Sequence, residues 1–351
     1  MAVRSHRKKQ GDPYPGGNGV SRRVLVTGAA GFIGSHVAEA LLSRGDQVIG
    51  LDNFDPYYDV GQKRTNVAEV MAAPGSNRFF FVEGDIRNRE LVNSIFAAHR
   101  LDSVIHLAAM AGVRASIEQP DVYVDVNVSG TLNLLEAARV HGLGNLVFAS
   151  TSSVYGNSVK LPFQEDMPAD RQLSPYAATK RAAELLGHTY HHLYGLNFTA
   201  VRLFTVYGPR NRPDMMAFKV LQSIYTGQKL PLYGAGNMYR DWTYVSDIVA
   251  GIIAASDRPL GYELFNLGRG EPTLLLEFVH TIEELVGRRA RFVAEPKLSS
   301  DASATHADIG KARQLLGYAP KVSILEGVTH CWSWYRRAVL GITGPRLSVA
   351  H

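Results

Sequence analysis

The 351-residue sequence predicts an α/β fold, a doubly wound parallel sheet with a smaller α/β lobe toward the C-terminus. From Arg22 onward, short runs rich in β-branched residues alternate with longer helical patterns. A turn with regularly spaced glycines separates the first run from the first helical pattern. After Thr205 the alternation stops, and segments rich in proline and glycine follow. The first two observations indicate the parallel sheet, and the third indicates the separate lobe.

The predicted elements follow one another as in a parallel sheet. The runs 23-RVLVTG-28 and 47-QVIGLDN-53 flank the helical pattern 34-GSHVAEALLSRG-45, and this order of strand, turn, helix and strand makes a βαβ unit. The pattern repeats, so we expect further strands at 79–85, 103–109, 145–150, 198–204 and 263–268. Helices are expected at 90–100, 127–142, 274–287 and 309–317.

Composition excludes several classes of protein. With 46% hydrophobic and 20% charged residues, the chain can bury a large core. Cys331 is the single cysteine, which excludes an internal disulfide and favours a buried packing role in a cytoplasmic protein. No apolar run approaches the roughly 20 residues of a membrane span, and the N-terminus lacks the apolar segment of a signal peptide. The sequence therefore predicts a protein without a membrane partner.

The net charge of +5 owes much to the N-terminal segment, which is basic and rich in proline and glycine. No recognition helix or zinc-finger pattern accompanies this segment, so we expect a solvated tail and no nucleic-acid partner. The twelve histidines show no metal-ligand spacing. The run 188-HTYHH-192 is interpreted as a solvated helix face, and no metal site is predicted.

The glycine-rich turn indicates a dinucleotide site. In 27-TGAAGFIGSH-36, Gly28, Gly31 and Gly34 lie between a strand and a helix, where a diphosphate can approach the helix N-terminus. The next strand ends in Asp52, whose carboxylate can accept hydrogen bonds from both ribose hydroxyls and would repel a 2′-phosphate, which favours NAD over NADP. Asp85 is a candidate for the adenine amino group. The predicted NAD-binding residues are Gly28, Gly31, Phe32, Ile33, Gly34, Asp52, Asn53, Asp85, Ile86, Leu107, Ala108, Ala109, Tyr176 and Lys180.

These assignments predict the organisation of the chain. Residues 1–20 form a flexible tail, and residues 21–203 form the NAD-binding domain. Residues 204–340 form mainly the substrate-binding lobe, although the chain is expected to return to the sheet near 243–270. Residues 341–351 are expected to form a second loose tail.

Tyr176 and Lys180 are spaced i, i+4 and therefore share one face of a helix. A nearby ammonium lowers the pKa of a tyrosine by stabilising the phenolate. A tyrosine tuned in this way can exchange a proton with a sugar hydroxyl while the cofactor exchanges a hydride with the same carbon. The expected catalytic residues include this pair.

From Val24 to Trp334 the chain resembles the extended short-chain dehydrogenases/reductases of the nucleotide-sugar epimerase and dehydratase group. The resemblance implies a Rossmann sheet, a catalytic triad of Thr151, Tyr176 and Lys180, and a homodimer built on paired helices that include 127–142 and 179–194. Within the group, the segments 51-LDNFDPYYDVGQKRTN-66, 108-AAMAGVRASIEQP-120 and 202-RLFTVYGPRNRPDM-215 resemble those of UDP-glucuronate 4-epimerases.

Two serines after Thr151 separate the activities of this group. Members that eliminate water carry Asp-Glu at these positions, and decarboxylases of UDP-uronates typically carry Ser-Glu, whereas this chain has Ser152 and Ser153. Without the acid and base that elimination needs, the dehydratase activity is disfavoured. An epimerase of a uronate must hold the substrate carboxylate still, for which hydroxyls and an arginine are suited. The predicted substrate-binding residues are Ser152, Ser153, Thr205 and Arg212 for the carboxylate, Thr151 and Tyr176 for the reacting hydroxyl, and Arg240 and Arg114 for the diphosphate or sugar.

The sequence therefore predicts an isomerase, which converts UDP-glucuronate to UDP-galacturonate through a transient 4-keto sugar while NAD is recycled. UDP-glucose 4-epimerisation and UDP-glucuronate decarboxylation stay open within the same fold. A non-catalytic NAD-binding redox sensor is the alternative from another class of protein. The segment 299–308 departs from the Pro-Gly-Asp that is usual in this group, so its substrate contacts are left open.

Overall fold

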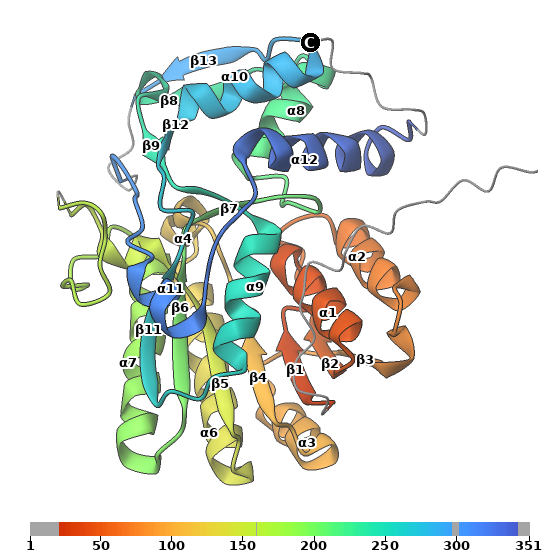
Figure 1. Cartoon of the computed structure of the whole chain (residues 1–351), viewed down its shortest axis with the longest axis vertical. Helices are drawn as coiled ribbons and strands as arrows, with labels where there is room; N and C mark the ends of the chain where they lie inside the picture. Colours follow the sequence, from red (N-terminus) through yellow and green to blue (C-terminus); the bar gives the residue numbers. More distant parts are fainter. Residues whose placement is uncertain (1–20, 159, 297–301, 343–351) are drawn as a thin grey trace, which may run out of the picture.

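The computed structural model describes residues 21–158, 160–296 and 302–342. Its centre is a seven-stranded sheet with the order β11-β6-β5-β4-β1-β2-β3, in which every neighbouring pair is parallel (Figure 1). This confirms the predicted doubly wound α/β fold. The strands are β1 (Arg23–Thr27), β2 (Gln47–Asp52), β3 (Phe79–Glu83), β4 (Ser103–His106), β5 (Asn145–Thr151), β6 (Phe198–Leu203) and β11 (Tyr262–Leu267).

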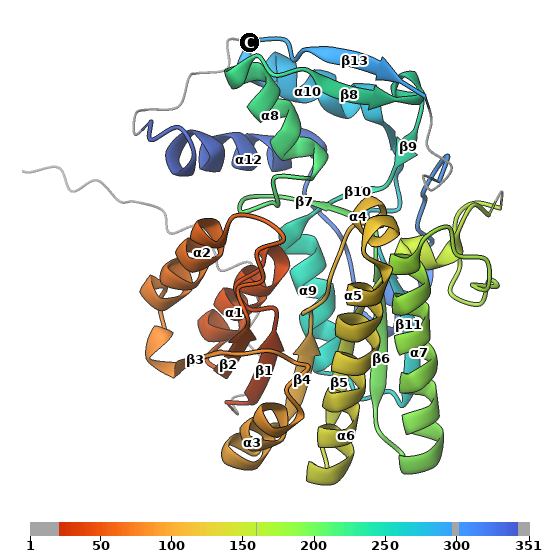
Figure 2. The same ribbon diagram turned by 180° about the vertical axis from the view of Figure 1, so that it is seen from behind.

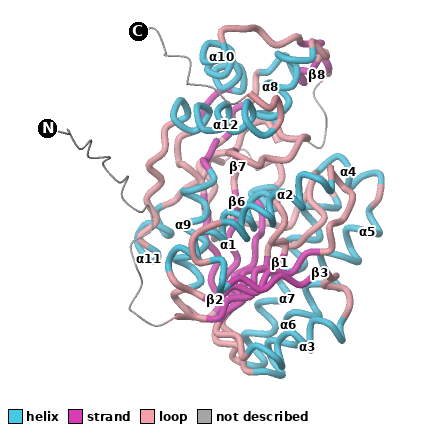
Figure 3. Tube along the Cα trace, turned by 90° about the vertical axis from the view of Figure 1, so that its right-hand side faces the viewer, coloured by secondary structure: helices cyan, strands magenta, loops and turns pink. Residues whose placement is uncertain are grey.

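Helices cover both faces of this sheet. Figure 1 shows α1, α2, α9 and α11 on the near face, and the reverse view in Figure 2 shows α3, α5, α6 and α7 on the other face, with α4 above them toward the lobe. The edge-on view in Figure 3 separates the two layers. The bounds are α1 (Phe32–Arg44), α2 (Val60–Ala72), α9 (Val245–Ser256) and α11 (Gly310–Leu316) for the first face, and α3 (Arg89–His99), α5 (Pro120–Val124), α6 (Thr131–His141) and α7 (Pro175–Tyr194) for the second; α4 spans Val113–Glu118.

Central strands are apolar on both faces because each face is covered by helices. Val24 and Val26 of β1 pack on the side of α1 and α9, whereas Leu25 packs on the side of α3 and α6. All seven residues of β5 are buried, and its last two are polar, Ser150 and Thr151. The carboxyl end of the buried strand β5 therefore presents two hydroxyl groups.

The smaller lobe is assembled from the second half of the chain. Its core packs the apolar faces of α8, α10 and α12 around Trp242, whose ring stacks on Phe278 with centroids 3.9 Å apart. Cys331 is buried in this core, as the sequence predicts. The elements are β7 (Thr205–Tyr207), α8 (Met216–Thr226), β8 (Leu230–Tyr233), β9 (Tyr239–Arg240), β10 (Trp242–Tyr244), β12 (Thr273–Leu274), α10 (Leu275–Val286), β13 (Phe292–Glu295) and α12 (Ile324–Ala338).

The chain crosses between the lobe and the sheet more than once. After β10 has paired with β7, α9 returns to the face of the large sheet. β11 then pairs with β6 along its whole length, from Tyr262 opposite Phe198 to Leu267 opposite Leu203. The edge of the large sheet is thus built by residues that follow much of the lobe in the sequence.

One predicted helix is interrupted. The sequence predicts a single helix over 127–142, but the structure has a π-helical segment, η2 (Asp125–Gly130), before α6. A π-helical turn inserts one residue and commonly lies at a functional site. Three short 3₁₀ turns complete the described structure: η1 (Ser76–Arg78), η3 (Ser152–Tyr155) and η4 (Gly234–Gly236).

None of the helices in the described part of the chain is both long and apolar enough to cross a membrane. Among residues 21–158, 160–296 and 302–342, no three His, Cys, Asp or Glu side chains are grouped so as to hold a metal ion.

Candidate active site

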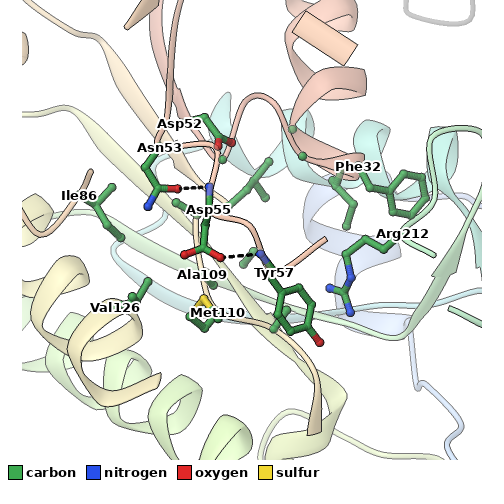
Figure 4. A pocket seen from close by; sticks show the side chains of 18 of the residues that line it. Phe32, Asp52, Asn53, Asp55, Tyr57, Ile86, Ala109, Met110, Val126 and Arg212 are labelled. Carbon is green, nitrogen blue, oxygen red and sulfur yellow. Dashed lines mark hydrogen bonds between the residues drawn. The ribbon is translucent and has the colours of Figure 1, made fainter. Parts of the chain in front are cut away.

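A cavity of about 270 Å³ opens at the carboxyl ends of the strands, where β1 and β4 lie side by side and the direction of winding reverses. In open α/β sheets this switch point is where ligands bind. Figure 4 shows side chains from the β2 end, the β4 end and the lobe converging on it. The predicted residues that line it are Gly28, Gly31, Phe32, Ile33, Gly34, Asp52, Asn53, Asp85, Ile86, Leu107, Ala108, Ala109, Thr151, Tyr176, Lys180 and Arg212.

The glycine turn is packed too closely for side chains. Gly28 has φ +72°, and a Cβ added to it would lie 2.7 Å from the backbone nitrogen of Ala108. A Cβ on Gly34 would overlap the carbonyl oxygen of Gly28. Gly31 caps the N-terminus of α1 without a side-chain hydrogen bond. The first N–H groups of α1 therefore stay available to an anion in the cavity.

Asp52 is buried and already organises the backbone around it. Its two carboxylate oxygens accept hydrogen bonds from the backbone N–H of Ala30, at 3.0 Å, and of Phe54, at 2.9 Å. Burial raises its pKa, and these hydrogen bonds and the nearby Lys63 oppose that effect. Each oxygen keeps a further lone pair, so the predicted role toward a ribose fits this geometry.

A strap beside the cavity, residues 53–59, follows β2, and of its residues only Asn53 is among the predicted site residues. Asn53 accepts a hydrogen bond from the backbone of Asp55, and Asp55 accepts one from that of Tyr57, as the dashed lines in Figure 4 show. Lys63 donates from Nζ to the backbone oxygen of Asp55 at 2.6 Å. All four of these side chains, together with Tyr58, line the cavity, so the strap is part of the site. Short runs of Asx turns leave no periodic signal, which is why sequence patterns alone miss them.

Two further side chains beside the cavity are absent from the sequence prediction. Tyr58 lines the cavity, and within the described residues its enclosed hydroxyl, beside Asp52, has no hydrogen bond. A second side chain that the sequence analysis missed, Asn127 of η2, binds the backbone N–H and carbonyl of Met110 and the hydroxyl of Thr179. Asn127 thereby fixes the loop after β4 against α7.

The predicted catalytic residues meet in this cavity. Ser174 caps α7 by accepting from the backbone of Ala177, and Pro175 occupies the first turn, which fixes where the helix begins. Tyr176 lies on that first turn, with its ring edge-on to Tyr123. Thr151 ends β5 and lies within hydrogen-bonding reach of Tyr176. The order strand end, cap and helix start brings Thr151, Tyr176 and Lys180 together.

The electrostatics of the pair differ from the sequence prediction. Burial is the largest effect on Tyr176 and raises its pKa, while the hydrogen bond with Thr151 and the charge of Arg212 oppose it. Lys180 is itself buried, which lowers its pKa to about 7 although Glu184 acts in the other direction. Its Nζ donates to the backbone oxygen of Ala149. The expected lowering of the tyrosine pKa by Lys180 is thus not seen, because burial also disfavours the charged form of the lysine.

Arg212 reaches the cavity from the lobe. Its Nε and Nη2 bind the two oxygens of Asp214 at 2.9 and 2.7 Å, and its guanidinium lies over the ring of Tyr57, 5.6 Å from the centroid. Figure 4 shows Arg212 and Tyr57 side by side. The sequence predicts Arg212 but neither Asp214 nor Tyr57.

Five predicted substrate residues lie outside the lining of the cavity. Ser152 and Ser153 begin η3, where the hydroxyl of Ser153 accepts a hydrogen bond from Thr151, and Thr205 begins β7. On the lobe side, Arg114 of α4 lies over the ring of Tyr233 at 4.1 Å, and Arg240 donates to the backbone oxygen of Tyr239. Residues 299–301 of the segment 299–308 lie outside the described residues.

A buried ion pair lies behind the catalytic helix. Glu184, one turn beyond Lys180, binds Nε and Nη2 of Arg202 on β6 at 3.0 and 2.8 Å. Ser150 donates to the same carboxylate, and Arg181 binds it at the partly buried end. Arg202 and Glu184 are 1% and 0% exposed, so this network ties α7 to the sheet without solvent.

Comparison with known proteins identifies the family. A model described as "NAD dependent epimerase/dehydratase family" matches residues 24–268, which is more than half of the chain. The chain belongs to this family. The match covers the sheet, the glycine turn, the catalytic helix and the cavity-lining loop of the lobe.

Individual relatives in this family agree with that assignment. A UDP-glucuronate 4-epimerase of Thermodesulfobacterium geofontis is 46% identical over 316 residues, which are 90% of this chain and 96% of the relative. A solved structure of UDP-glucuronic acid 4-epimerase from Bacillus cereus, in complex with UDP-glucuronic acid and NAD, aligns with TM-score 0.83 and 34% identity over 90% of this chain and 99% of that one.

Epimerase/dehydratase family members with other activities are as similar in fold. A UDP-glucose 4-epimerase of Thermotoga maritima aligns with TM-score 0.82 and 32% identity, over 90% of this chain and 99% of that chain. A dTDP-glucose 4,6-dehydratase of Streptomyces venezuelae aligns with TM-score 0.83 and 33% identity, over 90% and 97%. The fold is thus shared by three activities, and the choice among them rests on the side chains of the cavity.

Proposed function

We propose that this protein is an isomerase, an NAD-dependent UDP-glucuronate 4-epimerase. The observation that carries the proposal is the presence of Arg212 in the same cavity as Tyr176 and Lys180. A guanidinium beside the proton-transfer group suits a sugar that carries a carboxylate. The similarity to UDP-glucuronate 4-epimerases over 90% of the chain supports the same substrate.

The cavity fits NAD. The glycine turn excludes side chains where a diphosphate must approach, and α1 offers uncapped N–H groups. Asp52 and Asn53 would hold the adenosine ribose, Asp85 and Ile86 the adenine, and Leu107 to Ala109 the middle of the cofactor. Bound NAD would supply the acceptor and donor of hydride at C4 of the sugar. Since the cofactor ends each cycle as it began, no external redox partner is required.

The residues of this chain supply the proton chemistry. Tyr176 takes the proton from the C4 hydroxyl and returns it on the opposite face, and Thr151 hydrogen-bonds the same oxygen. Burial raises the pKa of Tyr176 and so favours the protonated phenol, whereas the hydrogen bond of Thr151 and the charge of Arg212 lower the pKa and help the group to act as a base. Lys180 would anchor the nicotinamide ribose.

The carboxylate of the sugar would lie toward Arg212. Once C4 is a ketone, the uronate is a β-keto acid, and an unrestrained carboxylate could leave as CO2. No side-chain carboxylate follows Thr151, because Ser152 and Ser153 stand at those positions. These serines back Thr151 from η3, so we propose that they and Thr205 support the carboxylate site, and that Arg114 and Arg240 bind the diphosphate.

Proton NMR of UDP-glucuronate with the purified protein and no added NAD tests the function. UDP-galacturonate with little pentose is the expected product. A UDP-pentose would instead establish the decarboxylase, and conversion of UDP-glucose alone would establish the neutral hexose epimerase. Binding of NAD with no turnover of any UDP-sugar would favour the redox sensor.

We propose further that the protein works in the cytoplasm as a homodimer. Apolar side chains lie exposed on the outer layer of helices, on α6 and α7 in particular: Leu132, Val140, Leu185, Leu193 and Tyr194. Exposed apolar side chains on two neighbouring helices are typical of an interface between proteins. The helices that present it are the ones that the family resemblance assigns to the dimer.

A further inference from the structure

Arg212 is occupied before any substrate arrives. Its Nε and Nη2 form a bidentate pair with Asp214, and in the described residues its Nη1 has no protein hydrogen bond. Arg212 lines the cavity, whereas Asp214 is not among the lining residues. Asp214 therefore stands behind the arginine, and the guanidinium presents its remaining edge to the cavity.

The charge of Asp214 is secured from two sides. Burial acts to raise the pKa of this carboxyl, but the pairing with Arg212 and the charge of Lys219 on α8 outweigh it and lower the pKa. Lys219 in turn lies within the field of Arg114. A single carboxylate thus lies between cations of the lobe, and it stays ionised over the range in which the protein functions.

The proposed reaction imposes a conflict on Arg212. Arg212 must bind the uronate carboxylate, yet the 4-keto sugar must rotate in the cavity so that its other face receives the hydride. A bidentate guanidinium-carboxylate pair in a poorly solvated cavity is strong, and a guanidinium left there without a partner is costly. An arginine alone would hold the intermediate in its first orientation.

We infer that Asp214 is a positioning residue. It is the counter-ion of Arg212 in the absence of substrate, and it lets the uronate carboxylate dissociate from the guanidinium when the 4-keto sugar rotates. The inference rests on the proposed function. Asp214 keeps Arg212 compensated whether or not the sugar is bound, so the two carboxylates share one guanidinium in the complex and neither binds it fully. The wall formed by the ring of Tyr57 keeps the guanidinium in place while the sugar moves.

This arrangement lowers the affinity for the uronate and speeds the rotation of the 4-keto intermediate. Two carboxylates on one guanidinium repel each other, and even in a water-like medium charges about 4 Å apart would weaken uronate binding about fivefold. Removing the charge of Asp214 should therefore tighten the binding of a uronate and leave the binding of a neutral hexose unchanged. Removing this charge should also slow the rotation of the 4-keto intermediate, which then has more time to lose CO2.

The test compares wild type, Asp214→Asn and Asp214→Glu in steady-state turnover of UDP-glucuronate with NMR of the products. We expect Asp214→Asn to lower KM at least about fivefold, which is the effect of that repulsion in a water-like medium, and to lower kcat while the pentose fraction rises. Asp214→Glu, which keeps the charge, should restore most of kcat. Glu271→Gln is the matched control, because it breaks another arginine pair spaced i, i+2, with Arg269, outside the cavity.

Binding is measured separately in a Tyr176→Phe background, where chemistry is stopped. We expect Asp214→Asn to tighten UDP-glucuronate and to leave UDP-glucose unaffected. Weaker uronate binding, or an equal change for both sugars, would overturn the inference and assign Asp214 a structural role. Failure of wild type to epimerise UDP-glucuronate would instead contradict the proposed function, and the two binding constants would still measure the effect of the charge.

Discussion

The Nζ of Lys180 donates a hydrogen bond to the backbone oxygen of Ala149 over 2.9 Å, in a position where Lys180 is 3% exposed. Burial lowers the pKa of this lysine to about 7, so both its charged and its neutral form are populated near neutral pH in the absence of ligand. A carboxylate or diphosphate that enters the cavity would shift this balance toward the ammonium. The protonation of the site and its occupancy are thus coupled.

Lys180 should make stability depend on pH above neutrality. An unfolded lysine keeps its proton up to about pH 10.4, whereas the folded one loses it near the lowered value, so between these limits the unfolded chain binds more protons and stability rises with pH. In urea unfolding from pH 6 to 9, the free energy of wild type relative to Lys180→Met should rise by at most about 1.4 kcal/mol per pH unit. Lys229→Met removes an exposed lysine and serves as control. A constant difference across this range would contradict the assignment.

Tyr176→Phe should abolish turnover and keep the fold. Loss of a positioned proton donor typically costs about 10²- to 10⁴-fold in rate. Circular dichroism and the amount of NAD that copurifies should match wild type, since the cofactor contacts of the glycine turn are intact. Tyr155→Phe is the control, because its hydroxyl binds Asn266 away from the cavity. An active Tyr176→Phe variant would assign proton transfer to another group.

Gly34→Ala should damage the nucleotide site. The new methyl group would overlap the carbonyl oxygen of Gly28, and overpacking of this kind typically costs about 1–3 kcal/mol. Thermal unfolding with and without NAD should show a lower melting temperature and a smaller stabilisation by the cofactor. Gly61→Ala, at an exposed position of α2 where the nearest side chain is that of Asp59, should change neither quantity by a comparable amount.

Glu184→Gln should destabilise the protein strongly. The change leaves Arg202 buried without its counter-charge, and breaking a buried pair in this way costs about 3–5 kcal/mol. Glu263→Gln breaks the pair with Lys311 at the surface and should cost at most about 1 kcal/mol. Equal losses in chemical denaturation would show that burial does not decide the effect.

The proposed dimer can be tested with one charge on its surface. Leu193 on α7 is 58% exposed and Leu325 on α12 is 59% exposed, so the two side chains are matched in exposure on different parts of the molecule. Leu193→Asp should shift the protein toward monomer in sedimentation, because a charge in an apolar interface is costly. Leu325→Asp should leave the mass unchanged. A dimer that survives the first substitution would place the interface elsewhere.

The sequence predicted best those parts of the site that are formed by a short local segment with a known backbone conformation. The spacing of Gly28, Gly31 and Gly34, and the strand that ends in Asp52, led to the sheet, the turn and the edge where the cavity lies. The i, i+4 pair of Tyr176 and Lys180 led to the catalytic helix. In each case the signal is local, since it lies within a few residues of the chain.

Side chains that depend on distant partners were not predictable in this way. The contact of Tyr57 with the guanidinium of Arg212 joins two segments that are far apart in the sequence and meet only in the folded chain. The pKa of Lys180 followed burial, which the i, i+4 spacing does not report. The interruption of the helix at η2 depends on the contacts of Asn127 with Met110 and Thr179, which lie at 17 and 52 residues' separation.

The pairing of β11 with β6 has a consequence for engineering. A fragment that stops at Leu203 would lack its outer strand and the α9 side chains Ile248, Val249 and Ile252, which cover Val147 and Val201. Such a fragment would expose a hydrophobic sheet face and aggregate. Chimeras that exchange substrate specificity between relatives should therefore graft the lobe segments 204–244, 268–296 and 323–342 as separate inserts and leave α11 with the sheet. A single crossover in the middle of the chain would divide one hydrophobic core between two parents.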